Sequence, residues 1–171
     1  IPIILMGYYN PFFKFGLKAF TRAAKDAGVD GLLIVDLPPE EAVEMKIHTD
    51  RAGLDLIFLL APTSGPERID SIVKHATGFI YYVSLTGVTG VRSTLDRTIR
   101  NQLETIRKKS PLPIGAGFGI STPEHAKTVA RWADAVVVGS ALIKIISGST
   151  SKAGAVQNAG RFIRTLKAAM R

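Results

Sequence analysis

Three glycine-rich stretches lie in the second half of the chain, and each one follows or ends an apolar run. They are residues 84–90 (Ser-Leu-Thr-Gly-Val-Thr-Gly), 113–121 (Pro-Ile-Gly-Ala-Gly-Phe-Gly-Ile-Ser) and 135–141 (Ala-Val-Val-Val-Gly-Ser-Ala). Backbone N–H groups in such loops and at helix N-termini offer an anion hydrogen bonds and a favourable dipole. Three of these turns in consecutive units favour one shared phosphate, although each glycine could also serve a tight turn alone.

Two further side chains lie at or near the ends of predicted strands, where they could contact a substrate. Asp36 follows an apolar run and is the one carboxylate at the carboxyl end of a predicted strand, the position that catalytic groups take in repeated βα folds. It could transfer protons, or it could orient a neighbouring loop. Tyr81 comes just before the first glycine-rich stretch, so it either lines a pocket or belongs to the core.

The residues do not form the patterns of metal or thiol chemistry. His48, His75 and His125 fall in helix-like segments with no partner at metal-ligand spacing, so we expect no metal site. The chain has no cysteine, which excludes disulfides and thiolate chemistry.

Size and composition are ordinary for one soluble α/β domain. The chain has 171 residues, of which 46% are hydrophobic and 21% charged. No apolar run approaches the ~20 residues that a membrane helix needs. No cleavable signal pattern opens the sequence. We therefore expect a cytoplasmic protein that does not bind membranes.

The formal charge of +8 arises from 22 Lys and Arg residues against 14 Asp and Glu residues. Basic residues scatter over separate helix-like segments, which is typical of solvated helix faces. Nucleic-acid binding would need concentrated positive charge with aromatic platforms, so we do not expect it. A modest positive field would still favour a phosphorylated substrate.

The elements that must position these residues form six strand-plus-helix units. Near-continuous apolar runs, typical of parallel strands buried on both faces, predict strands over residues 1–6, 32–35, 56–60, 78–83, 113–116 and 135–138. Apolar spacing near 3.6 predicts helices over 12–27, 38–52, 67–75, 96–109, 121–132, 141–146 and 155–170. Nothing between the units suggests a tight hairpin, so we expect parallel pairing.

Two architectures fit this repeat, a doubly wound open sheet and a (β/α)8 TIM barrel. The late glycine signals and the helix start at Ser140 favour the barrel, and no Gly-x-Gly-x-x-Gly follows the first strand. A barrel has eight strands in ~250 residues. We therefore expect one partial TIM-barrel domain over residues 1–171, with strands 3–8 and their helices, that lacks its first two βα units.

At the level of motifs the chain resembles the tryptophan synthase alpha subunit. The resemblance rests on residues 81–90 (Tyr-Tyr-Val-Ser-Leu-Thr-Gly-Val-Thr-Gly), 117–121 and 138–141, in the family's order. Further matches are the Tyr-Tyr-Asn-Pro at 8–11, the Val-Asp-Leu-Pro at 35–38 and the Ala-Pro-Thr at 61–63. It implies cleavage of indole-3-glycerol phosphate to indole and glyceraldehyde 3-phosphate, without metal or organic cofactor, in a heterotetramer with the beta subunit.

The resemblance also implies roles for single residues. Phosphate contacts are implied at Gly90, Gly119, Gly139 and Ser140. Substrate-pocket positions are implied at Met6, Tyr8, Leu33, Val35, Leu59, Tyr81, Thr89 and Phe118. Asp36 is implied near the closing loop, and Asn10 matches a surface that meets the beta subunit.

The family's two proton-transfer groups, a Glu on the second strand and an Asp in the loop after it, would precede Ile1. No catalytic residue is therefore expected in the chain, and we expect it to be inactive alone. Two alternatives stay open: another phosphate-binding barrel, of the phosphoribosyl anthranilate isomerase or indole-glycerol-phosphate synthase type, and an inactive truncated barrel.

Two physical expectations follow from a partial barrel with a glycine-hinged loop. Residues 84–90 could form a lid over the substrate, hinged at Gly87 and Gly90. An open six-stranded sheet would expose strand edges and apolar surface, so we expect self-association or poor solubility.

Overall fold

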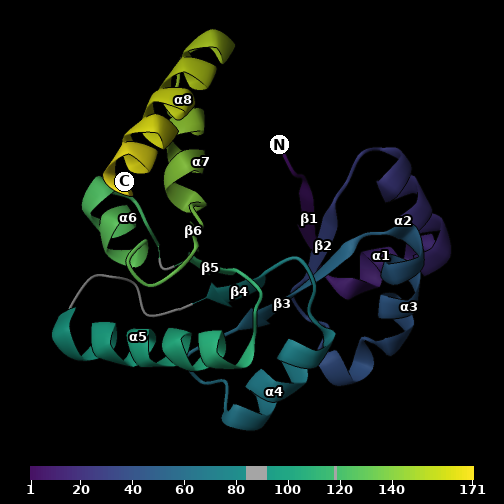
Figure 1. Ribbon diagram of the computed structural model, residues 1–171. Helices are drawn as coiled ribbons and strands as arrows, with labels where there is room; N and C mark the ends of the chain where they lie inside the picture. Colours follow the sequence, from purple (N-terminus) through teal and green to yellow (C-terminus); the bar gives the residue numbers. More distant parts are fainter. Residues whose placement is uncertain (84–91, 118) are drawn as a thin grey trace. The chain divides into compact units, whose positions relative to one another are not determined.

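The computed structural model describes residues 1–83, 92–117 and 119–171 (Figure 1). The chain divides into two compact units. The first comprises Ile1–Tyr81 and Ile106–Pro113, and the second comprises Tyr82–Thr105 and Ile114–Arg171. The single domain expected over residues 1–171 stays a prediction.

Three parallel strands form the centre of the first unit. They are β1 (Ile4–Gly7), β2 (Gly31–Ile34) and β3 (Asp55–Leu60). β2 lies between the other two, with Leu32 opposite Leu5 in β1 and opposite Leu56 in β3. All four residues of β2 are buried. A strand covered on both faces needs apolar side chains throughout, which is why these runs do not alternate.

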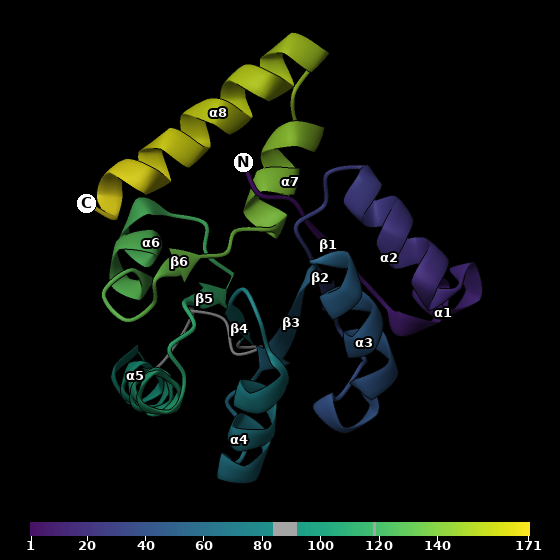
Figure 2. The same ribbon diagram turned by 45° about the vertical axis from the view of Figure 1, so that its right-hand side comes forward.

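Helices follow each of these strands. They are α1 (Tyr9–Phe15), α2 (Leu17–Asp26), the 3-10 helix η1 (Pro39–Glu41), α3 (Val43–Ala52) and α4 (Pro66–His75). α2 and α3 lie side by side (Figures 1 and 2). The prediction of one helix over residues 12–27 is wrong, because Gly16, with a φ of 90°, separates α1 from α2. The predicted stop at Gly28 is confirmed by its left-handed φ of 85°.

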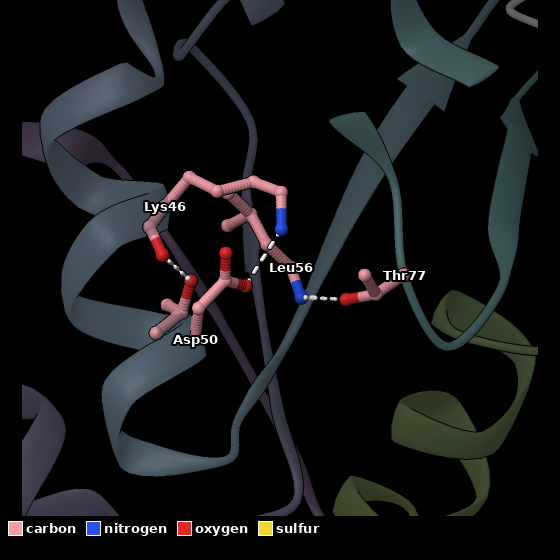
Figure 3. A network of polar contacts seen from close by, with 5 residues as sticks. Lys46, Asp50, Leu56 and Thr77 are labelled. Carbon is pink, nitrogen blue, oxygen red and sulfur yellow. Dashed lines mark hydrogen bonds and ion pairs between the residues drawn. The ribbon is translucent and has the colours of Figure 1, made fainter. Parts of the chain in front are cut away.

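Side-chain hydrogen bonds lie within α3 and at the start of β3 (Figure 3). Lys46 Nζ donates to Asp50 Oδ1 at 2.6 Å along the exposed side of the helix. The Leu56 amide, at the start of β3, donates to Thr77 Oγ1 at 2.8 Å. The second bond ties β3 to the turn before β4 (Ile80–Val83). One of these bonds therefore lies within α3, and the other joins β3 to a residue 21 positions later in the chain.

The second unit contains two strands paired in parallel and the helices that follow them. Its elements are β5 (Ile114–Gly117), α6 (Pro123–Val129), β6 (Ala135–Val136), α7 (Ser140–Ser147) and α8 (Lys152–Ala169). α6 and α7 both pack against α8 (Figure 2). α5 (Arg92–Lys109) begins in this unit, and its last four residues belong to the first unit.

Side-chain caps explain where two of these helices begin. Thr122 Oγ1 accepts from the His125 amide at 3.2 Å, which confirms the helix start predicted near residues 121–123. Ser151 Oγ accepts from the Gly154 amide at 3.1 Å and starts α8. The repeating, parallel βα order makes the fold α/β, as predicted. In the described part of the chain, no helix is long and apolar enough to cross a membrane.

Candidate functional site

The carboxyl ends of β5 and β6 bring two of the three glycine-rich stretches to one edge of the second unit. The two strands are paired in register, and the Val137 amide donates to the Ala116 carbonyl at 2.8 Å just beyond β6. The chain then continues to Gly119 after β5 and to Gly139 after β6. Parallel strands that are paired in register end at the same edge, so both glycines lie at that edge.

Gly119 has a backbone conformation that favours glycine. Its φ is 70°, in the left-handed region, and a Cβ added to it would have no heavy atom within 4 Å. The requirement for glycine is therefore conformational rather than one of packing. The residue is exposed, and the next residue, Ile120, is only 2% exposed and anchors the turn in the core.

Gly139 and Ser140 form the start of α7. Gly139 is the N-cap residue, and no side chain caps this end of the helix. The first N–H groups of a helix have no partner within it, so an external anion can accept hydrogen bonds from them. Both residues are exposed, and open space surrounds the position of a Cβ at Gly139. This end of α7 has the chemistry of a phosphate site.

In the first unit, the strands carry the predicted pocket residues at their carboxyl ends. Met6 lies opposite Leu33 across β1 and β2, and the Val35 amide donates to the Gly7 carbonyl at 3.0 Å. Leu33 is 4% exposed, whereas Met6 is 62% exposed. Tyr8, at the N-cap of α1, is 65% exposed. These residues thus share one edge but differ widely in burial.

A cleft at this edge brings three of the predicted residues together. It has a volume of about 270 Å³, and Val35, Asp36 and Leu59 all line it. Arg68, from the first turn of α4, lines it too and was not predicted from the sequence. Its only sequence signal is its place just after a predicted loop.

Arg68 is held by an acidic partner from η1. Its guanidinium donates to Glu40 Oε2 at 3.1 Å, and the Ser71 hydroxyl donates to the other oxygen of Glu40 at 3.1 Å. The backbone N–H bond of Glu40, with smaller contributions from Ser71 and Arg68, lowers the pKa of this exposed carboxyl. The cation in the cleft wall is thus paired with a charged carboxylate.

Asp36 is engaged in a structural contact. Its Oδ1 accepts from the Tyr9 amide at 2.7 Å, at the start of α1. The bond joins the carboxyl end of β2 to the first residue of α1, which lies between Tyr8 and Asn10 in the chain. Asn10 is exposed in the first turn of α1. The geometry supports a positioning role for Asp36, and direct proton transfer by it stays a prediction.

Two tyrosines stand at the end of β4. Burial raises the pKa of Tyr81, which is half-buried. Burial raises the pKa of Tyr82 to about 12, and its hydroxyl donates to Gln102 Oε1 on α5. Tyr82 is core, at 1% exposed. A pocket role for Tyr81 stays a prediction.

Four predicted features fall on residues that the structure leaves undescribed. Gly90, Thr89 and the whole proposed lid over residues 84–90 lie outside the described residues, and so does Phe118. Their roles stay predictions.

The histidines lie in α3, α4 and α6, as expected from the sequence. His75 Nδ1 lies 2.8 Å from the Ser71 carbonyl oxygen, whereas the buried Nδ1 of His125 lacks a hydrogen-bond partner among the described residues. Within residues 1–83, 92–117 and 119–171, no group of three or more His, Cys, Asp or Glu side chains could hold a metal ion.

The whole chain matches one protein family. The model of the family described as "Tryptophan synthase alpha chain" matches residues 1–171. The alpha chain of Citrifermentans bemidjiense is 53% identical over 167 residues, which are 98% of this chain and 62% of that one. The alpha chain of Geobacter sulfurreducens is 50% identical over 171 residues, which are 100% of this chain and 63% of that one.

Solved structures show the same likeness. The alpha chain of Legionella pneumophila subsp. pneumophila superposes with a TM-score of 0.85 at 40% identity, over 99% of this chain and 62% of that one. A chain of the Pyrococcus furiosus tryptophan synthase α2β2 complex gives a TM-score of 0.86 at 38% identity, over 98% of this chain and 67% of that one.

Each unit has the parallel βα order that a TIM-barrel-like fold requires. The solved structures are similar to this chain over nearly its whole length. The α/β, TIM-barrel-like fold predicted from the sequence is confirmed at this level. The chain spans about three fifths of the length of the curated relatives that it matches. On the match over residues 1–171, the chain belongs to the tryptophan synthase alpha chain family.

Proposed function

We propose that this chain is part of an alpha subunit that cleaves indole-3-glycerol phosphate to indole and glyceraldehyde 3-phosphate. The observation that carries the proposal is the family match over the whole chain, at 50% identity to a curated alpha chain. The other phosphate-binding barrels considered from the sequence are not favoured, because these matches name one family.

The proposed reaction is a retro-aldol cleavage that needs two proton movements. One proton is added to C3 of the indole ring, and one is removed from the hydroxyl on the adjacent glycerol carbon. The bond between these two carbons then breaks, its electron pair returns to the indole, and the carbon with the hydroxyl becomes an aldehyde. Carboxyl groups are suited to both transfers. We propose that both belong to segments outside the 171 residues, and that the six strands correspond to strands 3–8 of the barrel.

In the second unit, the proposed role of the described residues is to hold the phosphate. Gly119, Gly139 and Ser140 lie at the shared edge of β5 and β6, and the uncapped start of α7 offers N–H donors there. An ionised phosphate accepts short, strong hydrogen bonds from such donors. Gly90 is proposed to complete this set.

In the first unit, the proposed role is to surround the indole. Val35 and Leu59 line the cleft at the carboxyl ends of β2 and β3, Leu33 is buried in β2, and Met6 and Tyr8 are exposed on the β1 side. We propose Phe118, Thr89 and Tyr81 as further pocket residues. Asn10, exposed at the start of α1, is proposed to meet the beta subunit. One structural relative is titled as an α2β2 complex, which supports a beta-subunit partner.

The phosphate site can be tested by binding, without any turnover. Isothermal titration should show that the protein binds rac-glycerol 3-phosphate and indole-3-propanol phosphate. Replacing Ser140 by Ala should weaken binding of both by about tenfold, the value of one hydrogen bond to a charged group. Ser147→Ala, at the other end of the same helix, is the matched control and should bind like the parent.

Two outcomes would contradict the proposal. One is the absence of saturable binding of either phosphate, and the other is an equal effect of both serine substitutions. The 171-residue chain should show no cleavage of indole-3-glycerol phosphate above background, because the two proton-transfer groups are proposed to lie elsewhere. Cleavage by this chain alone would overturn that part.

A further inference from the structure

A second cleft in the first unit has four Lys and Arg residues in its lining, and all its lining residues lie on helices. It lies between α2 and α3, which pack side by side, and has a volume of about 260 Å³. Lys18, Arg22 and Lys25 enter it from α2, and His48 and Arg51 enter it from α3. We call these five residues the basic cleft.

Helix periodicity places these cations together. Lys18, Arg22 and Lys25 are spaced i, i+4 and i+7, so they share one face of α2. His48 and Arg51 are three residues apart and share one face of α3. Like charges at the spacing of Lys18, Arg22 and Lys25 repel each other and weaken a helix, and a bound anion would relieve that repulsion.

The protein's own carboxylates neutralise little of this charge. Asp26 is the one acidic residue of the cleft lining, and its oxygen lies 3.9 Å from Arg22 Nε, with both side chains more than 70% exposed. Pairs this long and this exposed contribute little. Glu44 does not line this cleft, although it lines the adjoining cavity together with Lys18 and Arg22.

The other three Lys and Arg side chains of the cleft form no ion pair among the described residues. Lys25 Nζ donates to the carbonyl oxygen of Gly53 at 2.9 Å, which orients the ammonium without cancelling its charge. In the part of the chain that the structure describes, Lys18 and Arg51 form no ion pair. Within the lining of this cleft, four Lys and Arg side chains therefore accompany one carboxylate.

The spread of these cations favours an extended anion. Lys18 and Lys25 are seven residues apart, about 10 Å along the helix axis. A single phosphate would meet both lysines only if their side chains bent toward each other, whereas two or three linked phosphates span the distance directly. The lining of the cleft includes no Phe, Tyr or Trp ring, and the adjoining cavity has one such ring in its lining, that of Phe13, so a run of stacked bases is not favoured.

We propose that the basic cleft binds a chain of two or more linked phosphate groups. This chemistry occurs in free inorganic oligophosphates and in nucleoside triphosphates. The site is separate from the phosphate site proposed at α7, because all five of its residues lie on α2 and α3. The proposal for the basic cleft can therefore be tested independently of the proposed function.

Titration calorimetry can test the proposal with tripolyphosphate, ATP, adenosine and orthophosphate as probes. Excess rac-glycerol 3-phosphate is present throughout, to occupy the site proposed at α7. Tripolyphosphate should bind at one site, at least tenfold more tightly than orthophosphate, and adenosine should not bind. Equal affinities for tripolyphosphate and ATP would assign the contacts to the phosphates, whereas tighter binding of ATP would point to a nucleotide as the source.

The variant Lys18→Gln, Arg22→Gln, Arg51→Gln should lower the affinity for tripolyphosphate at least tenfold. The control variant Lys127→Gln, Lys144→Gln, Arg161→Gln removes the same charge from exposed positions in the second unit and should change it less than twofold. Circular dichroism melting confirms that each variant is folded, and the single variant Arg51→Gln serves if the triple variant is not.

Three results would overturn the proposal. They are the absence of saturable tripolyphosphate binding, an equal loss in both triple variants, and tighter binding of single-stranded oligo-uridine than of tripolyphosphate. The second would indicate a response to net charge alone, and the third would identify a nucleic-acid surface instead.

Discussion

At the scale of single residues, Asp36 could either position α1 or transfer protons, and its contact with Tyr9 bears on that choice. Its Oδ1 accepts from the Tyr9 amide at 2.7 Å, so the side chain fastens the start of α1 to the end of β2. A positioning residue needs only an acceptor atom, whereas a proton carrier needs an ionisable group. Asparagine has an acceptor oxygen but no ionisable group, and alanine has neither.

We predict that Asp36→Ala lowers the free energy of unfolding by about 1–2 kcal/mol, because it leaves the Tyr9 amide without its acceptor. Asp36→Asn should cost less than half as much. Urea denaturation measures both, and Asp26→Ala is the control, because Asp26 has only a long, exposed ion pair. If Asp36→Ala is no more destabilising than the control, the fastening role is wrong.

At the scale of elements, two left-handed glycines differ in what surrounds them. Gly28, after α2, has a φ of 85° and no heavy atom within 4 Å of an added Cβ. Gly78, before β4, has a φ of 70°, and an added Cβ would lie 2.9 Å from Asp55 Cβ. The backbone cost of alanine is similar at both positions, but Gly78 adds a steric clash with β3.

We predict that Gly28→Ala costs about 1 kcal/mol of unfolding free energy, from the left-handed backbone alone. Gly78→Ala should cost about 3 kcal/mol, because Asp55 and the start of β3 must shift as well. Urea denaturation of the two variants measures the difference. Equal costs would mean that the turn before β4 can move away from β3 freely.

Local signals predicted most of these elements. Glycine at helix ends, proline in first turns and unbroken apolar runs placed the helices and strands to within a few residues. The break at Gly16 was missed because the apolar positions on both sides continue one helical spacing. In the structure, the rings of Phe12 and Phe20 meet across the break, with centroids 4.6 Å apart. That tertiary contact stabilises a bend that the spacing of the apolar residues does not indicate.

Some residues of the candidate site could be predicted from the sequence, but the contacts between distant parts of the chain could not. Val35 and Leu59 could be assigned to the pocket because strand ends are local features that a motif marks. The contact of Asp36 with Tyr9 and the entry of Arg68 into the cleft join residues 27 and more positions apart. Such contacts depend on strand register and helix packing, which the sequence pattern alone does not specify.

At the scale of the whole molecule, exposed apolar surface and net charge act in opposite directions. Ile143 on α7 and Val156 on α8 are 63% and 71% exposed, and these two helices pack against each other. Both side chains add exposed apolar area to this pair of helices, and exposed apolar area favours association between copies. The formal charge of +8 on every copy opposes it.

We predict that self-association increases with salt, because the charge repulsion is screened over a Debye length of ~8 Å at 0.15 M salt while the apolar attraction remains. Sedimentation velocity over a range of protein and NaCl concentrations measures this. The variant Ile143→Gln, Val156→Gln should shift the association to several-fold higher protein concentration. The matched variant Val43→Gln, Ile47→Gln, on α3, should shift it less, since it leaves the α7–α8 surface intact. Association that weakens with salt would show instead that ion pairs between copies hold them together, and a monomer under all conditions would show that this surface does not drive association.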